Sequence, residues 1–219
     1  MSARTLVTTA AALLAACSAA IAAPLPAPAY DPQAAGVQSA VLSGGCFWGV
    51  QGVFEHVRGV KKVWAGYAGG KRATAQYEIV GSGMTGHAES VEITYDPAQI
   101  SYGQILRIFF SVATDPTVVN RQGPDEGPQY RSEIFYRSTA QKVVAERYIA
   151  QLNGAKAFGR PIATRVDPDT GFFHAEDYHQ DYLVHHPDAP YIAINDLPKV
   201  RALKAEFPTL WREAPVLAM

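Results

Sequence analysis

The stretch QSAVLSGGCFWGVQGVFEHV, residues 38–57, predicts a strand that is followed at once by a helix. Its first six residues are partly β-branched and end at two glycines, as expected of a short strand. From Phe47 onward, apolar residues recur at spacings of three and four, which indicates a helix face that ends near Gly59. Cys46 is therefore expected in the turn between the two elements, at the N-terminus of the helix.

A cysteine in this position is expected to be reactive rather than structural. The first amide groups of a helix and the helix dipole stabilise negative charge, which favours the thiolate form of Cys46. The neighbouring glycines leave room for another molecule to approach the backbone. The chain has 2 cysteines, and the other, Cys17, lies in an N-terminal export segment. Cys46 is thus expected to be the only free thiol, with no internal disulfide.

Residues 1–23 read as a secretory signal peptide, with one positive charge, a short apolar stretch and small residues at the end. Two cleavage sites fit this segment. The small residues 20–23 suit ordinary signal peptidase, whereas LAAC, residues 14–17, resembles a bacterial lipoprotein box in which Cys17 is lipidated and becomes the new N-terminus. Ser18 after that cysteine favours the outer membrane. We therefore expect an exported, periplasmic protein, anchored through Cys17 if the lipoprotein site is used.

Residues 24–37, rich in Ala and Pro, predict an extended linker, and residues 38–219 predict one catalytic domain. The net charge is -1 and no run of Lys or Arg stands out, which argues against a nucleic-acid partner. No apolar segment after the signal peptide is long enough to cross a bilayer, so the membrane is reached only through the lipid. The sequence shows no long apolar surface stripe, and a monomer is expected.

A strict alternation marks HAESVEITYDP, residues 87–97, as a strand. Glu89 shares one face of this strand with His87, Val91 and Ile93. If that face is turned to the core, Glu89 points inward, and its carboxyl group acquires a raised pKa. If Glu89 lies beyond the edge of the core, its side chain is solvated. Periodicity alone leaves both interpretations open.

The remaining pattern predicts an α+β fold. We expect further strands at 60–68, 131–136 and 160–166, and helices at 102–113 after a Ser101 cap, at 138–153 after a Ser138–Gln141 capping box, at 175–184 and at 197–207. The helix at 175–184 is expected to turn Tyr178 and Tyr182 to the core and its histidines outward. This order indicates a ferredoxin-like split βαβ sheet with helices and a long C-terminal wrap.

Three motifs in this order resemble the A type of peptide methionine sulfoxide reductase, which reduces the S epimer of methionine sulfoxide. They are GCFWG at 45–49, TGHAESVEITYDP at 85–97 and RQGPDEGPQYRS at 121–132. The resemblance extends from Val41 to NDLPKVRALKAEFP at 195–208. It implies that oxidised proteins and peptides containing methionine sulfoxide are the substrates, with Cys46 as the nucleophile and Glu89 as the general acid.

The resemblance also implies roles for six further residues. Tyr77 and Tyr130 match the tyrosines that bind the sulfoxide oxygen, and Phe47 and Trp48 match the apolar pocket for the S-methyl group. Asp125 matches an acidic residue that lines the site. His87, in the GHAE motif, is placed with the substrate-binding residues. No metal and no bound cofactor are implied.

The chain departs from many members of this family in one respect, because it lacks the further cysteines that close a disulfide with the oxidised nucleophile. Ala193, for example, stands where some relatives carry a thiol. The resemblance therefore implies that Cys46 is left as a sulfenic acid and is reduced from outside. The expected reductant is a thioredoxin-like or glutaredoxin-like protein or a small thiol.

Two other functions fit parts of the sequence. In a papain-like cysteine hydrolase, a histidine and an asparagine follow the thiol by about 130 and about 150 residues, a spacing that His174 or His179 and Asn195 satisfy. Against it, Phe47 separates Cys46 from the tryptophan, and Ser43 stands where that family has a second cysteine. A non-enzymatic aromatic module that binds peptides would not explain the thiol.

A metal site is not predicted from the four histidines near the C-terminus, because their spacing does not place two ligands on one helix face. These are His174, His179, His185 and His186.

Overall fold

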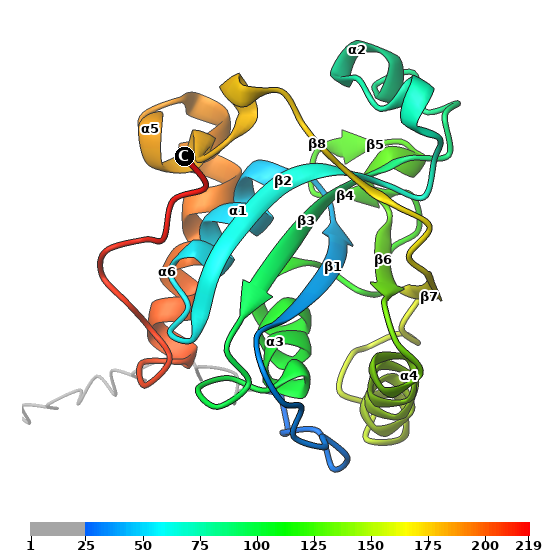
Figure 1. Cartoon of the computed structure of the whole chain (residues 1–219), viewed down its shortest axis with the longest axis vertical. Helices are drawn as coiled ribbons and strands as arrows, with labels where there is room; N and C mark the ends of the chain where they lie inside the picture. Colours follow the sequence, from blue (N-terminus) through cyan, green and yellow to red (C-terminus); the bar gives the residue numbers. More distant parts are fainter. Residues whose placement is uncertain (1–24) are drawn as a thin grey trace, which may run out of the picture.

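A curved sheet of six strands runs through the computed structural model, which describes residues 25–219 (Figure 1). The strand order is β7 (Arg165–Pro168), β6 (Ser132–Tyr136), β1 (Gln38–Gly44), β3 (Ala88–Tyr95), β2 (Val60–Ala68) and β8 (Phe172–His174). β6 and β7 pair in parallel, and the other neighbours are antiparallel. The inner order β6-β1-β3-β2 is that of a split βαβ sheet, which confirms the predicted α+β class.

Four longer helical segments accompany the sheet. They are α1 (Phe47–Glu55), α3 (Tyr102–Ile108) with a π-helical turn at Phe109–Ala113, α4 (Thr139–Gly154), and α6 (Leu197–Glu206) after a π-helical turn at Ile192–Asp196. Shorter elements are α2 (Tyr77–Val80), α5 (Tyr182–His185), single 3-10 turns at Arg72–Thr74, Pro128–Tyr130 and Asp177–His179, and a ribbon of β4 (Arg121–Gln122) with β5 (Asp125–Glu126).

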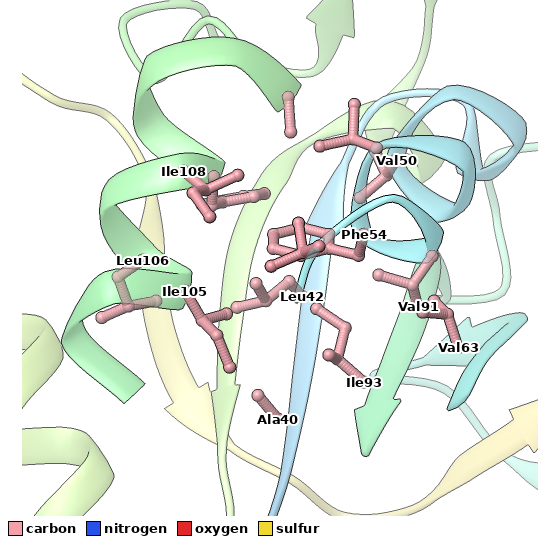
Figure 2. Packing of buried hydrophobic residues seen from close by; sticks show 14 of the residues in the cluster. Ala40, Leu42, Val50, Phe54, Val63, Val91, Ile93, Ile105, Leu106 and Ile108 are labelled. Atoms are coloured by element: carbon pink, nitrogen blue, oxygen red, sulfur yellow. The ribbon is translucent and has the colours of Figure 1, made fainter. Parts of the chain in front are cut away.

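Strand alternation decides which side chains meet the helices. Leu42 of β1 lies opposite Val91 of β3, and both enter the large core beneath α1 and α3 (Figure 2). Val41, one residue earlier, joins a small cluster on the other face of the sheet. Because side chains alternate along a strand, Glu89 takes the same face as Val91 and points toward α1. The inward interpretation of Glu89 is therefore correct.

Both predicted helix caps are present, but the second makes only one of the two hydrogen bonds of a capping box. The Ser101 hydroxyl accepts the Gln104 amide at 3.2 Å, and the Gln104 side chain accepts the Ser101 amide at 3.0 Å, which completes a capping box. The Ser138 hydroxyl accepts the Gln141 amide at 3.2 Å. The Gln141 side chain, however, accepts the amide of Arg137 instead.

The predictions for the strand after α4 and for the helix at 175–184 were wrong. The strand begins later, at Arg165, and β8 was not foreseen, because both are short edge strands without a clear alternation. The predicted helix is interrupted at Asp181, whose φ of 54° lies in the left-handed region. As a result, Tyr178 is 62% exposed and His179 is buried, the reverse of the expectation.

Buried polar contacts explain why this segment is not a helix. The Asp181 amide donates to Gln51 Oε1 of α1 at 3.0 Å, and Gln180 Oε1 accepts the Ala65 amide of β2 at 2.9 Å. These long-range hydrogen bonds fix the backbone in a conformation that local periodicity does not encode.

Residues 25–37 run as an extended segment along α3 and α4. The Tyr148 hydroxyl donates to the Pro26 carbonyl at 2.8 Å, and Asp31 accepts the Gly103 amide at 3.0 Å. The predicted signal peptide and Cys17 lie outside the described residues. Within residues 25–219, no helix has the length and apolar character needed to cross a membrane.

Candidate active site

Cys46 occupies the N-cap position of α1, directly after β1, as the sequence predicts. Its side chain is 7% exposed, and it is a free thiol. Gly45 before it has a φ of 99°, and a side chain there would lie 2.6 Å from Gln122. A glycine is therefore required for the chain to turn from β1 into the helix.

Glu89, near the start of β3, faces this turn. Its side chain is buried, and Oε2 accepts the backbone N–H of Phe47, the residue after Cys46, at 3.0 Å. Burial raises the pKa of Glu89 to about 8, although the Phe47 hydrogen bond acts in the opposite direction. The negative charges of Asp125 and Asp196 raise it further. Glu89 therefore carries a proton near neutral pH.

The expectation that the helix terminus makes Cys46 a thiolate was wrong, because burial outweighs the helix terminus. Burial raises the pKa of Cys46 well above its ordinary value, and the charges of Glu89 and Asp196 add to this effect. A hydrogen bond from the Trp48 amide lowers it but does not outweigh desolvation. Cys46 is thus a neutral thiol near neutral pH.

Two phenols share the site with Glu89. Tyr77 begins α2, and its amide donates to Glu176 Oε1 at 3.0 Å. Burial, followed by the charges of Glu89 and Cys46, raises the pKa of Tyr77 to about 12. Tyr130 ends a 3-10 turn, and burial and the charge of Glu89 raise its pKa as well. Both phenols therefore remain protonated and able to donate hydrogen bonds.

Phe47 and Trp48 build an apolar wall beside the thiol. The Phe47 ring is buried, 5.9 Å from Tyr67 and 5.0 Å from His179 between ring centroids. Trp48 stacks on Tyr182 at 4.0 Å, and its indole N–H donates to His179 Nδ1 at 3.2 Å. Phe47 is thus locked in the core, and Trp48 is fixed in orientation by a stack and a hydrogen bond.

His179, Tyr182 and Tyr191 were not predicted as site residues. Tyr191 packs edge-on against Trp48 at 6.0 Å, and its hydroxyl donates to Asp125. The signal that could have located them is weak, because all three lie in the C-terminal segment, which has little regular periodicity.

Asp125 lies in β5, and its charge raises the pKa values of Glu89 and Tyr130. His87 is placed differently from the other predicted residues. Its ring is buried against Tyr67 and Phe173, and Nε2 lies 3.0 Å from the Lys71 carbonyl. None of its hydrogen bonds reaches Cys46 or Glu89, so the structure assigns His87 to the packing around Tyr67.

The residues required by the hydrolase alternative do not converge on the thiol. His174 stacks on Trp64 at 4.4 Å, and Asn195 Nδ2 donates to the Tyr191 carbonyl at 3.1 Å. His179 Nδ1 is used by Trp48 rather than by Cys46. In the part of the chain that the structure describes, no three His, Cys, Asp or Glu side chains are grouped to hold a metal ion.

The family model described as peptide methionine sulfoxide reductase matches residues 38–210. The chain belongs to this family. It is 55% identical over 189 residues to peptide methionine sulfoxide reductase MsrA 2 of Mesorhizobium japonicum, covering 86% of this chain and 97% of that protein. It is 46% identical over 173 residues to MsrA of Thermus thermophilus, covering 79% and 97%.

Solved structures of such reductases are similar to this fold. Reduced Mxr1 of Saccharomyces cerevisiae aligns with a TM-score of 0.62 and 32% identity, over 70% of this chain and 87% of that chain. Methionine sulfoxide reductase A of Corynebacterium diphtheriae aligns with a TM-score of 0.60 and 31% identity, over 72% and 80%. The reductase described here is thus an oxidoreductase that reduces the S epimer of peptide methionine sulfoxide to methionine.

Proposed function

We propose that Cys46 is the nucleophile of this reductase and that Glu89 is its general acid. The observation that carries this assignment is the hydrogen bond from the Phe47 amide to Glu89 Oε2, which holds a protonated carboxyl group next to the thiol. Tyr77 and Tyr130 complete a set of three proton donors around Cys46. A sulfoxide sulfur becomes electrophilic when its oxygen is protonated or strongly hydrogen-bonded, and this set supplies that activation.

The first half-reaction then balances without an outside reagent. Glu89 gives its proton to the sulfoxide oxygen, the Cys46 thiol passes its proton to the Glu89 carboxylate, and Cys46 Sγ attacks the sulfoxide sulfur. The hydroxyl group then moves to Cys46 Sγ as the sulfur–oxygen bond and the new bond between the two sulfurs break. Methionine leaves, and Cys46 becomes a sulfenic acid, which is still reversible.

The apolar wall of Phe47 and Trp48 and the carboxylate of Asp125 orient the substrate. Phe47 and Trp48 contact the S-methyl group, which excludes water from the reacting sulfur. Asp125, which already accepts the Tyr191 hydroxyl, has a second oxygen with which to accept an amide N–H of the substrate backbone. His87 takes no direct part.

Reduction of the sulfenic acid needs an external thiol, because Cys46 is the one cysteine of residues 25–219. A thiolate attacks Cys46 Sγ, water leaves, and the resulting mixed disulfide is resolved by a second thiol. A thioredoxin-like or glutaredoxin-like protein, or a small thiol, meets this need.

Residues 1–23 direct the reductase to the periplasm, where it repairs oxidised envelope proteins as a monomer, with Cys17 as the lipidated N-terminus. Support comes from the LAAC box and the small residues around it. Expression of the full chain, followed by membrane fractionation and mass spectrometry of the N-terminal peptide, tests this. A soluble protein that begins after Ala23 would overturn the lipid anchor.

The residue roles are tested with four variants under turnover with a thiol reductant. We expect Cys46→Ser to lose activity, Glu89→Gln to lower kcat by about two to four powers of ten, and Tyr77→Phe and Tyr130→Phe each to lower it less. Glu146→Gln, on the exposed side of α4, is the matched control and should be unchanged. Activity of Cys46→Ser above the uncatalysed rate would overturn the proposal.

A further inference from the structure

Asp196 is the last residue of the π-helical turn that leads directly into α6, and its side chain makes no capping hydrogen bond. At the start of a helix, aspartate is favoured because its carboxylate accepts an amide of the first helical turn. Here Pro198, in the first turn, has no N–H to offer, and the Asp196 side chain is 0% exposed. Stabilisation of α6 by capping therefore does not explain this residue.

The two carboxylate oxygens of Asp196 have different surroundings. Oδ1 accepts a hydrogen bond from Lys199 Nζ at 3.0 Å, whereas Oδ2 is buried and has no hydrogen-bond partner in the described structure. A buried carboxylate oxygen without a partner is costly. Such a group is kept where its charge acts on something else.

The carboxylate of Asp196 lies against the first turn of α1. A methyl group on Gly49 would stand 2.0 Å from Oδ1, so only a glycine allows this approach. Gly49 follows Cys46 by three residues, and residues three apart lie on the same side of a helix. Asp196 thus brings negative charge to the side of the helix terminus that carries the thiol, where the positive end of the helix dipole would otherwise stabilise a thiolate.

We propose that Asp196 is a positioning residue that keeps Cys46 in the protonated thiol form until the sulfoxide occupies the site. The inference rests on the proposed role of Cys46 as nucleophile. A thiolate reacts directly with peroxides, and a sulfenic acid that no second cysteine captures can be oxidised further and irreversibly. A reductase with one cysteine in its catalytic domain gains protection if its thiol ionises only with substrate bound.

The electrostatics of the site agree with this role. Asp196 raises the pKa of Cys46, after burial and Glu89, while Lys199 lowers it. Burial raises the pKa of Asp196 as well, but the ion pair with Lys199 lowers it, whereas Glu89 holds a proton near neutral pH. The ion-paired Asp196 is therefore the better source of negative charge beside the thiol. The charged and titratable groups that face Cys46 and Asp196 from the surrounding elements are Glu89, Asp125, Tyr77, Tyr130, Tyr191 and Lys199.

The test is the pH dependence of iodoacetamide alkylation of Cys46 in the full chain, followed by intact mass. In Asp196→Asn we expect the midpoint of the profile to fall by one pH unit or more, which makes alkylation about tenfold faster below the midpoint. Asp188→Asn removes the same charge from an exposed position eight residues earlier, and its profile should match the parent protein.

A purely structural role gives a different result. If Asp196 only anchors α6 to α1, Asp196→Asn lowers the thermal unfolding midpoint and leaves the alkylation midpoint within 0.3 pH units, which would overturn the proposal. Asp196→Ser, which also removes the charge, serves if the asparagine variant does not fold. Failure of the nucleophile assignment is recognised separately, as sulfoxide reduction by Cys46→Ser.

Discussion

Glu89 Oε2 accepts the backbone N–H of Phe47 at 3.0 Å, so the acid is fixed by the helix turn that presents the nucleophile. The same amide would otherwise help to stabilise a thiolate at the helix terminus. The geometry thus couples the protonation states of Glu89 and Cys46, because the negative charge of Glu89 raises the pKa of Cys46.

This coupling predicts the alkaline limb of the pH profile. Glu89 acts in its protonated form with a pKa of about 8, so kcat for the chemical step should fall as pH rises through about 8. In Glu89→Gln the remaining activity is low and should not show this limb. Single-turnover rates between pH 6 and pH 10 measure both. An alkaline limb that persists at the same pH in the variant would show that another group titrates.

The hydrogen bond from Trp48 to His179 predicts a change in substrate binding. His179→Phe keeps an aromatic ring but removes the Nδ1 acceptor, which leaves the indole N–H without its partner at 3.2 Å. We expect KM for a blocked sulfoxide to rise roughly tenfold with a smaller change in kcat, because Trp48 loses its orientation. His179→Gln restores an acceptor and should recover part of the loss. Equal effects of the two substitutions would contradict a role for the hydrogen bond.

The buried Arg131–Glu133 pair predicts the largest loss of stability. The Arg131 guanidinium contacts Glu133 and also donates to the carbonyls of Pro128, at 2.8 Å, and Gly86, at 3.0 Å, which holds the turn that carries Tyr130. Arg131→Met should lower the free energy of unfolding by about 3–5 kcal/mol, because Glu133 is left buried without its main partner.

Arg165 provides the matched control. It also pairs with Glu133, at 3.6 Å, but its side chain is 59% exposed, so Arg165→Met should cost less than about 1 kcal/mol. Urea unfolding of the two variants measures the difference. Similar losses would mean that the buried geometry around Arg131 is not what stabilises this region.

The buried carboxyl group of Glu55, beside Asp181, predicts pH-dependent stability away from the active site. Burial, and then the neighbouring Asp181 carboxylate, raises the pKa of Glu55 well above 4.5, and neither carboxyl oxygen of Glu55 has a hydrogen-bond partner among the described residues. Between about pH 4.5 and the folded pKa, the unfolded chain ionises while the folded chain keeps its proton, so stability falls as pH rises. Glu55→Gln lacks this slope, and its stability relative to the parent should increase from pH 5 to pH 8, by at most about 1.4 kcal/mol per pH unit.

The measurement is urea unfolding of both proteins at the two pH values. Glu78→Gln, an exposed position in α2, should show the same dependence as the parent. A relative stability of Glu55→Gln that does not change with pH would show that Glu55 ionises normally in the folded state.

The central sheet and the nucleophile could be predicted from the sequence because they rest on local patterns. The alternation at 87–97 and the helical spacing after Cys46 are complete within single elements, and the motifs around them indicate the family. The surroundings of the site are different. The position of His179 depends on the left-handed backbone of Asp181, and that of Asp196 depends on the π-helical turn at Ile192–Asp196. Contacts between residues distant in sequence, such as the hydrogen bond from the Asp181 amide to Gln51, fix this part of the backbone. The protonation of Cys46 was also missed, because desolvation depends on packing that a motif does not show.

The measurement that tests the account most directly is a single turnover without reductant. Protein beginning at Pro24, which keeps the segment 25–37 packed along α3 and α4, is mixed with a blocked S-methionine sulfoxide and, separately, with the R epimer, and methionine and intact mass are determined. We predict about one methionine per enzyme from the S epimer alone, with Cys46 gaining one oxygen or reacting with a sulfenic-acid reagent. Methionine from neither epimer, or its formation without any change at Cys46, would contradict the account.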